Sequence, residues 1–481
     1  MKNNTKYLLK NVGLLTLSNF GSKILVFLLV PIYTRLLSTE EYGIYDIYLT
    51  TITLLIPVLS LNIVEAVMRF ALDRKIEKSK VLSIGIKIAI KSILYCAILM
   101  IINYFTNFID IFNKYPQYFL LYYALNIIYD LVTQFAKSID KIFDFAIASI
   151  LNSLTMLLLN IVFLVVFKMK LNGYFLANCL AFAIPIVYLS IRLKLWKYIR
   201  IKSKDEELKK QMIKYSSPLI LNNIGWWITN ASDRYILTAM KGLSENGIYS
   251  VSYKVPSILN VVQAIFSQAW IMSAVKAYDD KENEFIGQTY KIYNCVFVLL
   301  CSIIIIFTKI ITKILVANDF YIAWRYAPFL MISVLFTSLS NFLAGLFAAS
   351  KESKIMGRTT IIGAVINIIL NIILIYFIGT IGAAISTMIS YIVVWFSRIK
   401  MLKNIINLEV NLYRDCIGYL ILIVQAVVIN ILNIGMRIYI IEGILLISLI
   451  MLYNKEIKGI LDKIWVIIFK KKFKNQNSKK I

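Results

Sequence analysis

The chain has 481 residues, of which 59% are apolar and 16% are charged, and its mean hydropathy is +0.75. Apolar runs of about 20 residues recur along the whole length, which excludes a soluble globular protein because no soluble core buries so much apolar surface. The 52 Lys and Arg against 26 Asp and Glu give a formal charge of +26. Since these basic residues lie between the apolar runs, they indicate cytoplasmic loops rather than a nucleic-acid-binding surface.

The five cysteines lack the spacing of metal ligands, and the chain contains no histidine. Histidine is the commonest proton carrier and metal ligand at neutral pH. We therefore expect no disulfide framework, no metal site and no cofactor.

The apolar runs are twice the length of barrel strands and lack their alternation, so they predict an all-α integral membrane protein. We predict about fourteen transmembrane helices, at residues 12–34, 44–68, 82–104, 117–136, 143–167, 171–191, 214–240, 247–275, 290–312, 325–349, 358–378, 380–400, 413–433 and 436–454. With this number, most Lys and Arg fall on one side, which predicts a protein of the cytoplasmic membrane with both termini cytoplasmic. The first run has no small-residue cleavage site, so we expect an uncleaved first span.

The two halves of the chain share a pattern. Leu37-Ser38 followed by Gly43-Ile44-Tyr45 opens the second span, and Leu243-Ser244 followed by Gly247-Ile248-Tyr249 opens the eighth; the glycines are 204 residues apart. Each half contributes six spans, an even number, so both halves start on the same side and the repeat is parallel. Two such lobes enclose a cavity, which is the architecture of alternating-access carriers.

This repeat predicts the domain organisation. We expect, in chain order, an amino-terminal lobe at 1–191, a basic cytoplasmic linker at 192–213, a second lobe at 214–403, an added pair of spans within 404–454 and a basic cytoplasmic tail at 455–481. In the tail, residues 461–473 mix aromatic and aliphatic side chains with lysines, which predicts a helix lying on the inner leaflet.

Short motifs in a fixed order then point to a family. They are Ser18-Asn19-Phe20-Gly21-Ser22-Lys23, Pro31 to Arg35, Glu41 to Tyr45, Asp233-Arg234-Tyr235-Ile236-Leu237, Tyr253-Lys254-Val255-Pro256, Asn367 to Asn371 and Gly379 to Ala384. Over nearly its whole length the chain resembles the Wzx-type polysaccharide repeat-unit flippases of the MOP superfamily, which are relatives of the lipid II flippases and the MATE exporters.

The resemblance implies a flippase that moves an undecaprenyl-diphosphate-linked oligosaccharide outward, for capsule, O-antigen or related polysaccharide. It also implies membrane lipids, a polysaccharide polymerase and glycosyltransferases as partners, and no nucleic acid. Two alternatives stay open: a MATE-like exporter of organic cations, and a membrane glycosyltransferase or polymerase. The first needs acids rather than lysines in its cavity, and the second needs a catalytic carboxylate pair that the sequence does not show, so we expect a carrier and not an enzyme.

Ionisable residues within spans are functional candidates because each costs a few kcal/mol to place in a membrane. Lys23 in the first span and Lys254 in the eighth resemble basic positions of the lipid II flippases, which implies that they contact the diphosphate from the two lobes. Lysines that extend toward the membrane surface, or that pair within one lobe, are the alternative.

Four further residues form two pairs, and the two members of each pair lie four residues apart on the same helix. Lys87 and Lys91 share a face of the third span and are candidates for the cytoplasmic mouth of the cavity, unless they extend to the lipid surface. Glu65 and Arg69 are expected to form an ion pair within the second span.

Two adjacent charges, Asp233 and Arg234, lie near the external end of the seventh span and on different faces of it. They are candidates for gating contacts between lobes or for anchoring the helix end. Asp130 and Glu442 are isolated acids and weaker candidates for a cation site.

Overall fold

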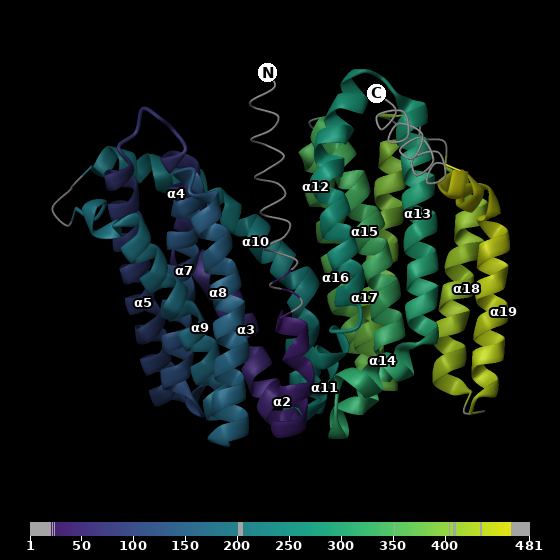
Figure 1. Cartoon of the computed structure of the whole chain (residues 1–481), viewed down its shortest axis with the longest axis horizontal. Helices are drawn as coiled ribbons and strands as arrows, with labels where there is room; N and C mark the ends of the chain where they lie inside the picture. The colour runs from purple at the N-terminus through teal and green to yellow at the C-terminus, as the bar shows by residue number, and fades with distance from the viewer. Residues whose placement is uncertain are drawn as a thin grey trace, which may run out of the picture. The chain divides into compact units, whose positions relative to one another are not determined.

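The computed structural model describes residues 25–200, 205–350, 352–403, 405–406, 410–432 and 435–462, together with Gly21 and Lys23 (Figure 1). All regular elements of this described part are helices, and ten of them are long and apolar enough to cross a membrane. If the bent pair Arg437–Leu452 and Asn454–Asp462 is one span, the number rises to eleven. The predicted all-α membrane class is therefore confirmed, while the number fourteen stays a prediction.

The chain folds into two compact units. The first unit comprises Met1–Val251 with Ile314–Tyr321, and the second comprises Ser252–Lys313 with Ile322–Ile481. The sequence placed the division between lobes in the linker 192–213, whereas contacts within the chain divide it between Val251 and Ser252. The two divisions differ because the helix that follows the linker packs on helices of the first unit.

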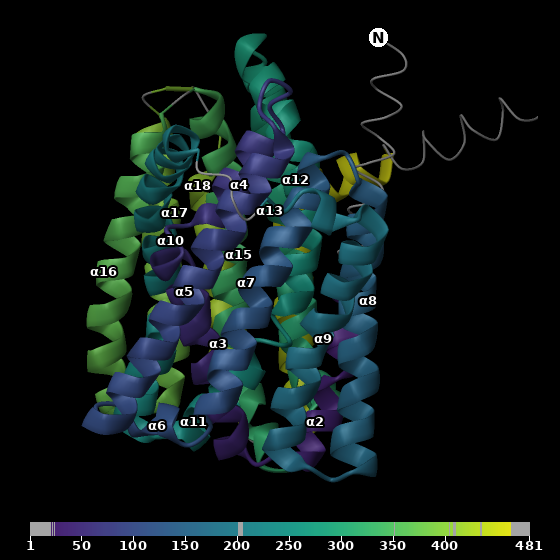
Figure 2. The same cartoon turned by 90° about the vertical axis from the view of Figure 1, so that its left-hand side faces the viewer.

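The first unit is a bundle in which α5, α7, α9 and α8 lie side by side, and α10 packs on α3 and α4 (Figures 1 and 2). Its elements are α2 (Val30–Leu36), α3 (Thr39–Leu59), α4 (Ile63–Ala71), α5 (Lys78–Thr106), α6 (Asp110–Asn113), α7 (Pro116–Ser138), α8 (Ile142–Asn160), the π-helical turn η1 (Ile161–Val166), α9 (Lys170–Leu193), the 3₁₀ turn η2 (Leu195–Lys197), α10 (Glu206–Lys241) and α11 (Leu243–Ser252).

The second unit is built around α15, which is buried along most of its length and contacts α12, α13, α16, α17 and α18. Its elements are α12 (Ser257–Asp279), α13 (Asn283–Ile306), α14 (Thr308–Leu315), the 3₁₀ segment η3 (Asn318–Arg325), α15 (Ala327–Ala349), α16 (Ser353–Ile378), α17 (Thr380–Leu402), α18 (Leu412–Ile431) and α19 (Arg437–Leu452). Residues 314–321, at the end of α14 and the start of η3, belong by their contacts to the first unit.

Local sequence explains where α3 begins and where it stops. Ser38 caps its start: the Ser38 hydroxyl accepts from the Glu41 backbone N–H at 3.1 Å, and the Glu41 carboxylate accepts from the Ser38 N–H at 2.8 Å. Near its end, Pro57 lacks a backbone N–H, and Leu61 and Asn62 then adopt left-handed conformations with φ of 54° and 52°. The span predicted at 44–68 is therefore two helices, α3 and α4.

The span predicted at 247–275 is also broken. Between α11 and α12 lie four residues, Tyr253 to Pro256, that are not helical. Proline disfavours the helical conformation of the residue before it, which accounts for a break at Val255-Pro256. Of the predicted surface helix at 461–473, only Leu461 and Asp462 lie within the described residues.

Candidate functional site

A buried ion pair joins α3 to α10 in the first unit. The Arg234 Nη1 lies 2.9 Å from Asp46 Oδ1 and also donates to the Thr50 hydroxyl at 3.1 Å. Asp46 is 5% exposed, and its second oxygen accepts from the Asn246 amide of α11 at 3.3 Å. Three helices thus converge on one carboxylate, and removing the Arg234 guanidinium would take away the counter-ion of the buried Asp46.

The neighbouring acid, Asp233, is tied to a different helix. Its Oδ2 accepts from the Tyr249 hydroxyl of α11 at 2.6 Å, and Asp233 is 2% exposed. Asp233 and Arg234 were predicted to lie on different faces, and the structure directs Asp233 to α11 and Arg234 mainly to α3. Their role as gating contacts stays a prediction; the contacts described here lie within the first unit.

Two glycines allow α3 and α11 to approach each other closely. A Cβ built on Gly43 would lie 2.0 Å from the Leu243 carbonyl oxygen, and one on Gly247 would lie 2.0 Å from the Thr39 carbonyl oxygen. Thr39 and Ser244 also share a hydrogen bond of 2.6 Å between their hydroxyls. Any larger residue at either glycine would push the two backbones apart and separate Asn246 and Tyr249 from the two aspartates.

Backbone groups of α3 and of the turn after it are further contacts for α10. The Trp227 indole N–H donates to the Thr50 carbonyl at 2.8 Å, and the Ser216 hydroxyl donates to the Leu61 carbonyl at 2.7 Å. Thr50 lies within α3, whereas Leu61 lies in the turn between α3 and α4, where carbonyls lack helical partners. Along most of its length α10 therefore packs on α3 and α4 of the first unit.

The two lysines that the resemblance implies for the diphosphate lie in different units. Lys23 is helical and exposed in the first unit, and Lys254 is half-buried in the non-helical turn between α11 and α12 in the second. The expected position of Lys254 inside a span is therefore corrected to a break between helices, which Pro256 explains. That both lysines contact one diphosphate stays a prediction.

Lys87 and Lys91 lie together at a pocket of about 360 Å³ on α5. The start of α10 forms its other wall, with the charged residues Asp205, Glu206 and Lys209. The Leu208 backbone N–H and the Lys80 ammonium hold the pKa of Asp205 below its usual value, so this carboxylate is ionised at neutral pH. The structure thus brings these two predicted residues to one site.

Glu65 and Arg69 do not form the ion pair that their spacing predicted. Both side chains are exposed on α4, and no salt bridge joins them in the part of the chain that the structure describes. Exposed side chains four apart gain little from pairing, because water and salt screen the attraction.

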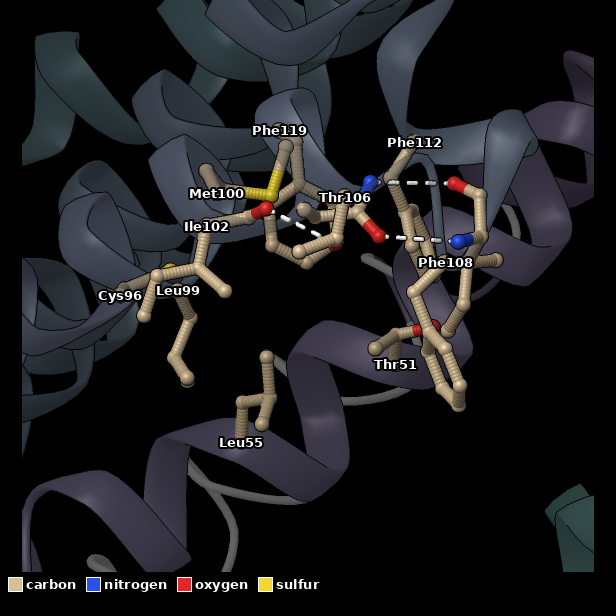
Figure 3. A pocket seen from close by; sticks show the side chains of 12 residues that line it. Thr51, Leu55, Cys96, Leu99, Met100, Ile102, Thr106, Phe108, Phe112 and Phe119 are labelled. Atoms are coloured by element: carbon tan, nitrogen blue, oxygen red, sulfur yellow. Dashed lines mark hydrogen bonds between the residues drawn. The ribbon is translucent and has the colours of Figure 1, made fainter.

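An apolar pocket of about 490 Å³ lies in the first unit between α3, α5, α6 and α7 (Figure 3). It is lined by Thr51, Leu55, Cys96, Leu99, Met100, Ile102, Asn103, Thr106, Phe108, Ile109, Phe112 and Phe119. No charged side chain is among them, so this pocket lacks the cations that a diphosphate needs.

Several residues of the site were not predicted. Asp46 lies inside the span predicted at 44–68, and an acid inside a span was itself sufficient reason to name it. Asn246 and Tyr249 lie next to the repeated glycine, where the sequence offered no indication that they contact acids.

In the second unit, Arg398 is 6% exposed and donates to the Ser340 carbonyl at 2.7 Å and to the hydroxyls of Thr359 and Thr360.

Comparison with known proteins adds the family. A family model described as polysaccharide biosynthesis protein matches residues 8–272, which is more than half of the chain. The chain belongs to the polysaccharide biosynthesis protein family. A search of curated proteins finds no match.

Solved structures show which fold this polysaccharide biosynthesis protein has. It is similar to the lipid II flippase MurJ in an inward closed conformation, with 13% identity, a TM-score of 0.70 and coverage of 92% of this chain and 98% of that one. It is also similar to a multidrug resistance MATE transporter of the MOP superfamily in an inward-facing conformation. The identity is 14% and the TM-score is 0.62, with coverage of 81% of this chain and 96% of that one. An outward-facing conformation of a MATE transporter gives 14% identity and a TM-score of 0.55, with coverage of 82% of this chain and 96% of that one.

At these identities the likeness shows the fold alone. The polysaccharide biosynthesis protein has the fold of MOP-superfamily transporters, and the resemblance that the sequence motifs indicated is confirmed. Its substrate does not follow from the fold.

Proposed function

We propose that this protein is a flippase that moves undecaprenyl-diphosphate-linked oligosaccharide repeat units across the cytoplasmic membrane. The observation that carries the proposal is the match of residues 8–272 to the polysaccharide biosynthesis family. The fold shared with a lipid II flippase supports it, because that protein is named for a lipid-linked cargo. Glycosyltransferases would supply the cargo and a polymerase would consume it.

In the proposed mechanism the protein is a carrier and not an enzyme. The two lobes alternate between inward-open and outward-open states around the cargo, and the lipid tail stays in the bilayer. Lys23 and Lys254 contact the diphosphate as point charges. Both termini lie in the cytoplasm, as the distribution of Lys and Arg favours.

The contacts of two buried acids in the first unit, Asp46 and Asp233, favour this cargo over an organic cation at that site. A cation exporter needs a carboxylate that is open to its cargo. Asp46 is already held by Arg234 and Asn246, and Asp233 is held by Tyr249. Opening either acid to a cation would break contacts that compensate a buried charge, at a cost of about 3 to 5 kcal/mol for a pair.

The test uses a cell whose polysaccharide export depends on this protein. Lys23→Ala, Lys254→Ala and the double variant are expected to lower export of the polymer, with undecaprenyl-linked oligosaccharide accumulating in the inner leaflet. Lys455→Ala, in an exposed lysine of the helix Asn454–Asp462, is the matched control and should export normally.

Normal export by the double variant at normal protein level would contradict the diphosphate role of the two lysines. If deletion of the protein leaves export intact but sensitises the cell to organic cations, the flippase proposal itself is wrong and the exporter alternative is favoured.

A further inference from the structure

Glu442 on α19 is a fully buried acid in the apolar part of the second unit. It is 0% exposed, and neither of its carboxylate oxygens accepts a hydrogen bond of normal geometry from the described residues. The Gln425 side chain of α18 is the polar group beside it. Residues 438–452 of α19 contain no other charged side chain. An ionised carboxylate here would be a buried charge without a counter-ion, which is costly.

Gln425 is also 0% exposed, and one long hydrogen bond orients its amide. The Gln425 Nε2 donates to the backbone carbonyl of Glu442 at 3.5 Å, whereas the Gln425 Oε1 is buried without a donor. The contact between α18 and α19 thus holds three side-chain oxygens that lack a donor, two on Glu442 and one on Gln425. A proton on Glu442 turns one of these acceptors into a donor.

The other end of the same helix pair shows how a buried acid is held when a cation is present. Asp415 is 0% exposed as well, but the Arg414 Nη2 lies 3.0 Å from its Oδ1. Glu442 has no such partner. Arg437 is five residues before it and, at 3.6 residues per turn, points about 140° away around α19. Tyr439, three residues before Glu442, is a phenol and is neutral at neutral pH.

The helices packed on α19 bring no charge to Glu442. These helices are α18 and α13. Their charged residues are Glu284 and Lys291 on α13 and Arg414 and Asp415 on α18. All four lie toward the end of α19 opposite to Glu442, because Tyr453, just after α19, bonds to Asn294 of α13 and to Asp415 of α18. The titratable group in the last two turns of α13 is the Cys301 thiol, which is neutral at neutral pH.

We propose that Glu442 is a proton-binding site, in which the carboxyl group holds one proton taken from water and donates it as a hydrogen bond to the Gln425 Oε1. The proton removes the buried charge and supplies the missing donor, so that one small ligand compensates both defects. The resulting bond joins α18 to α19. Separation of these two helices would open the acid to water and favour loss of the proton, so helix separation and proton release are linked. The proposal does not depend on the identity of the transported cargo.

Infrared spectroscopy of the purified full-length protein in nanodiscs tests the proposal directly. A protonated carboxylic acid has a carbonyl stretching band that is separate from the carboxylate and amide bands and that shifts in deuterium oxide. Wild-type protein at neutral pH is expected to show this band, and Glu442→Gln, a neutral residue of the same shape, is expected to lose it. Glu40→Gln is the matched control, because Glu40 is an exposed acid paired with Lys114, and it should keep the band.

Two infrared results would overturn the proposal. One is a wild-type protein without a carboxylic acid band, which needs no variant to be interpreted. The other is a Glu442→Gln variant that loses intensity in the carboxylate region and keeps the whole carboxylic acid band.

Thermal unfolding in the same nanodiscs tests the acceptor and the kind of ligand. Gln425→Leu is expected to lower the midpoint, because the buried O–H of Glu442 then lacks an acceptor. The control is Gln288→Leu at an exposed glutamine of α13, which should leave the midpoint unchanged. Equal midpoints for wild type and Gln425→Leu would overturn the role of Gln425. A sodium-dependent rise of the midpoint in wild type that Glu442→Gln lacks would show a metal cation in place of the proton and would overturn the proposal.

Discussion

Gly43 on α3 and Gly247 on α11 lie so close that a Cβ on either would approach a carbonyl oxygen of the other helix to 2.0 Å. The contact is reciprocal: the oxygens belong to Leu243 and Thr39, which are separated by the same 204 residues as the glycines. The two copies of the repeated motif therefore pack on each other. Close approach of two backbones explains why both copies carry glycine at this position.

Gly43→Ala and Gly247→Ala should each destabilise the protein strongly. Real Cβ atoms do not approach a carbonyl oxygen to 2.0 Å. Since the obstructing atoms belong to the backbone, α3 or α11 would have to shift to make room. We expect a loss of about 3 kcal/mol or more in the free energy of unfolding, measured as a lower midpoint of thermal unfolding in detergent. Gly225→Ala is the matched control, because a Cβ there meets no atom within 4 Å. Equal midpoints for all three variants would contradict the close crossing.

Breaking the Asp46–Arg234 pair should cost more than removing both charges. Asp46→Asn or Arg234→Gln alone leaves one charge without its partner, with an expected loss of about 3 to 5 kcal/mol. The double variant should recover part of this loss, which a double-mutant cycle of unfolding midpoints measures. Glu40→Gln, in the exposed Lys114–Glu40 pair, should change stability by less than about 1 kcal/mol. Additive single effects would argue against a direct pair.

Tyr249→Phe removes only a hydroxyl from the buried contact with Asp233. The ring still fills its site, so the expected loss of about 1 to 3 kcal/mol in the free energy of unfolding reports the loss of this hydrogen bond. The same substitution at Tyr413, which is 82% exposed, should have no measurable effect. The readout is thermal unfolding of the two variants side by side, and equal midpoints would mean that the 2.6 Å bond contributes nothing.

Thiol labelling should report the orientation in the membrane. Of the five cysteines, Cys416 alone is exposed and the other four are buried. Cys416 lies at the start of α18, on the side predicted to be cytoplasmic, so a membrane-impermeant maleimide should label it in inside-out vesicles and not in intact cells. Phe108→Cys in a Cys416→Ser background should label in the opposite way, because residue 108 follows α5 and is 86% exposed. Labelling of Cys416 from outside would invert the predicted topology.

Much of the helical fold was predictable from hydropathy alone, because a membrane span must satisfy its own backbone hydrogen bonds and therefore appears as a continuous apolar run. Breaks within a span were harder to predict. The turn at Leu61-Asn62 and the turn ending at Pro256 interrupt runs that remain apolar on both sides, so hydropathy does not change where the helix stops. Proline at positions 57 and 256 was visible, but proline bends some helices and ends others.

The charged site was predictable only in part, because its partners are distant in sequence. Arg234 was named as a candidate, yet Asp46 is 188 residues before it and nothing local connects the two. The spacing of four residues gave a wrong prediction for Glu65 and Arg69. They lie one turn apart on a helix, but an ion pair between exposed side chains contributes too little free energy to keep them in contact. Spacing along one helix thus predicted which residues share a face, not which of them bond.

The segment 314–321 gives the connectivity an unusual property. Because these residues pack with the first unit while the chain on both sides packs with the second, the polypeptide passes from one unit to the other three times. A single proteolytic nick between Val251 and Ser252 would give two fragments without a covalent link, but the second fragment would still contribute residues 314–321 to the first unit, so we expect the fragments to copurify. Any rearrangement of the two bodies during a working cycle must also bend the backbone at all three passages together.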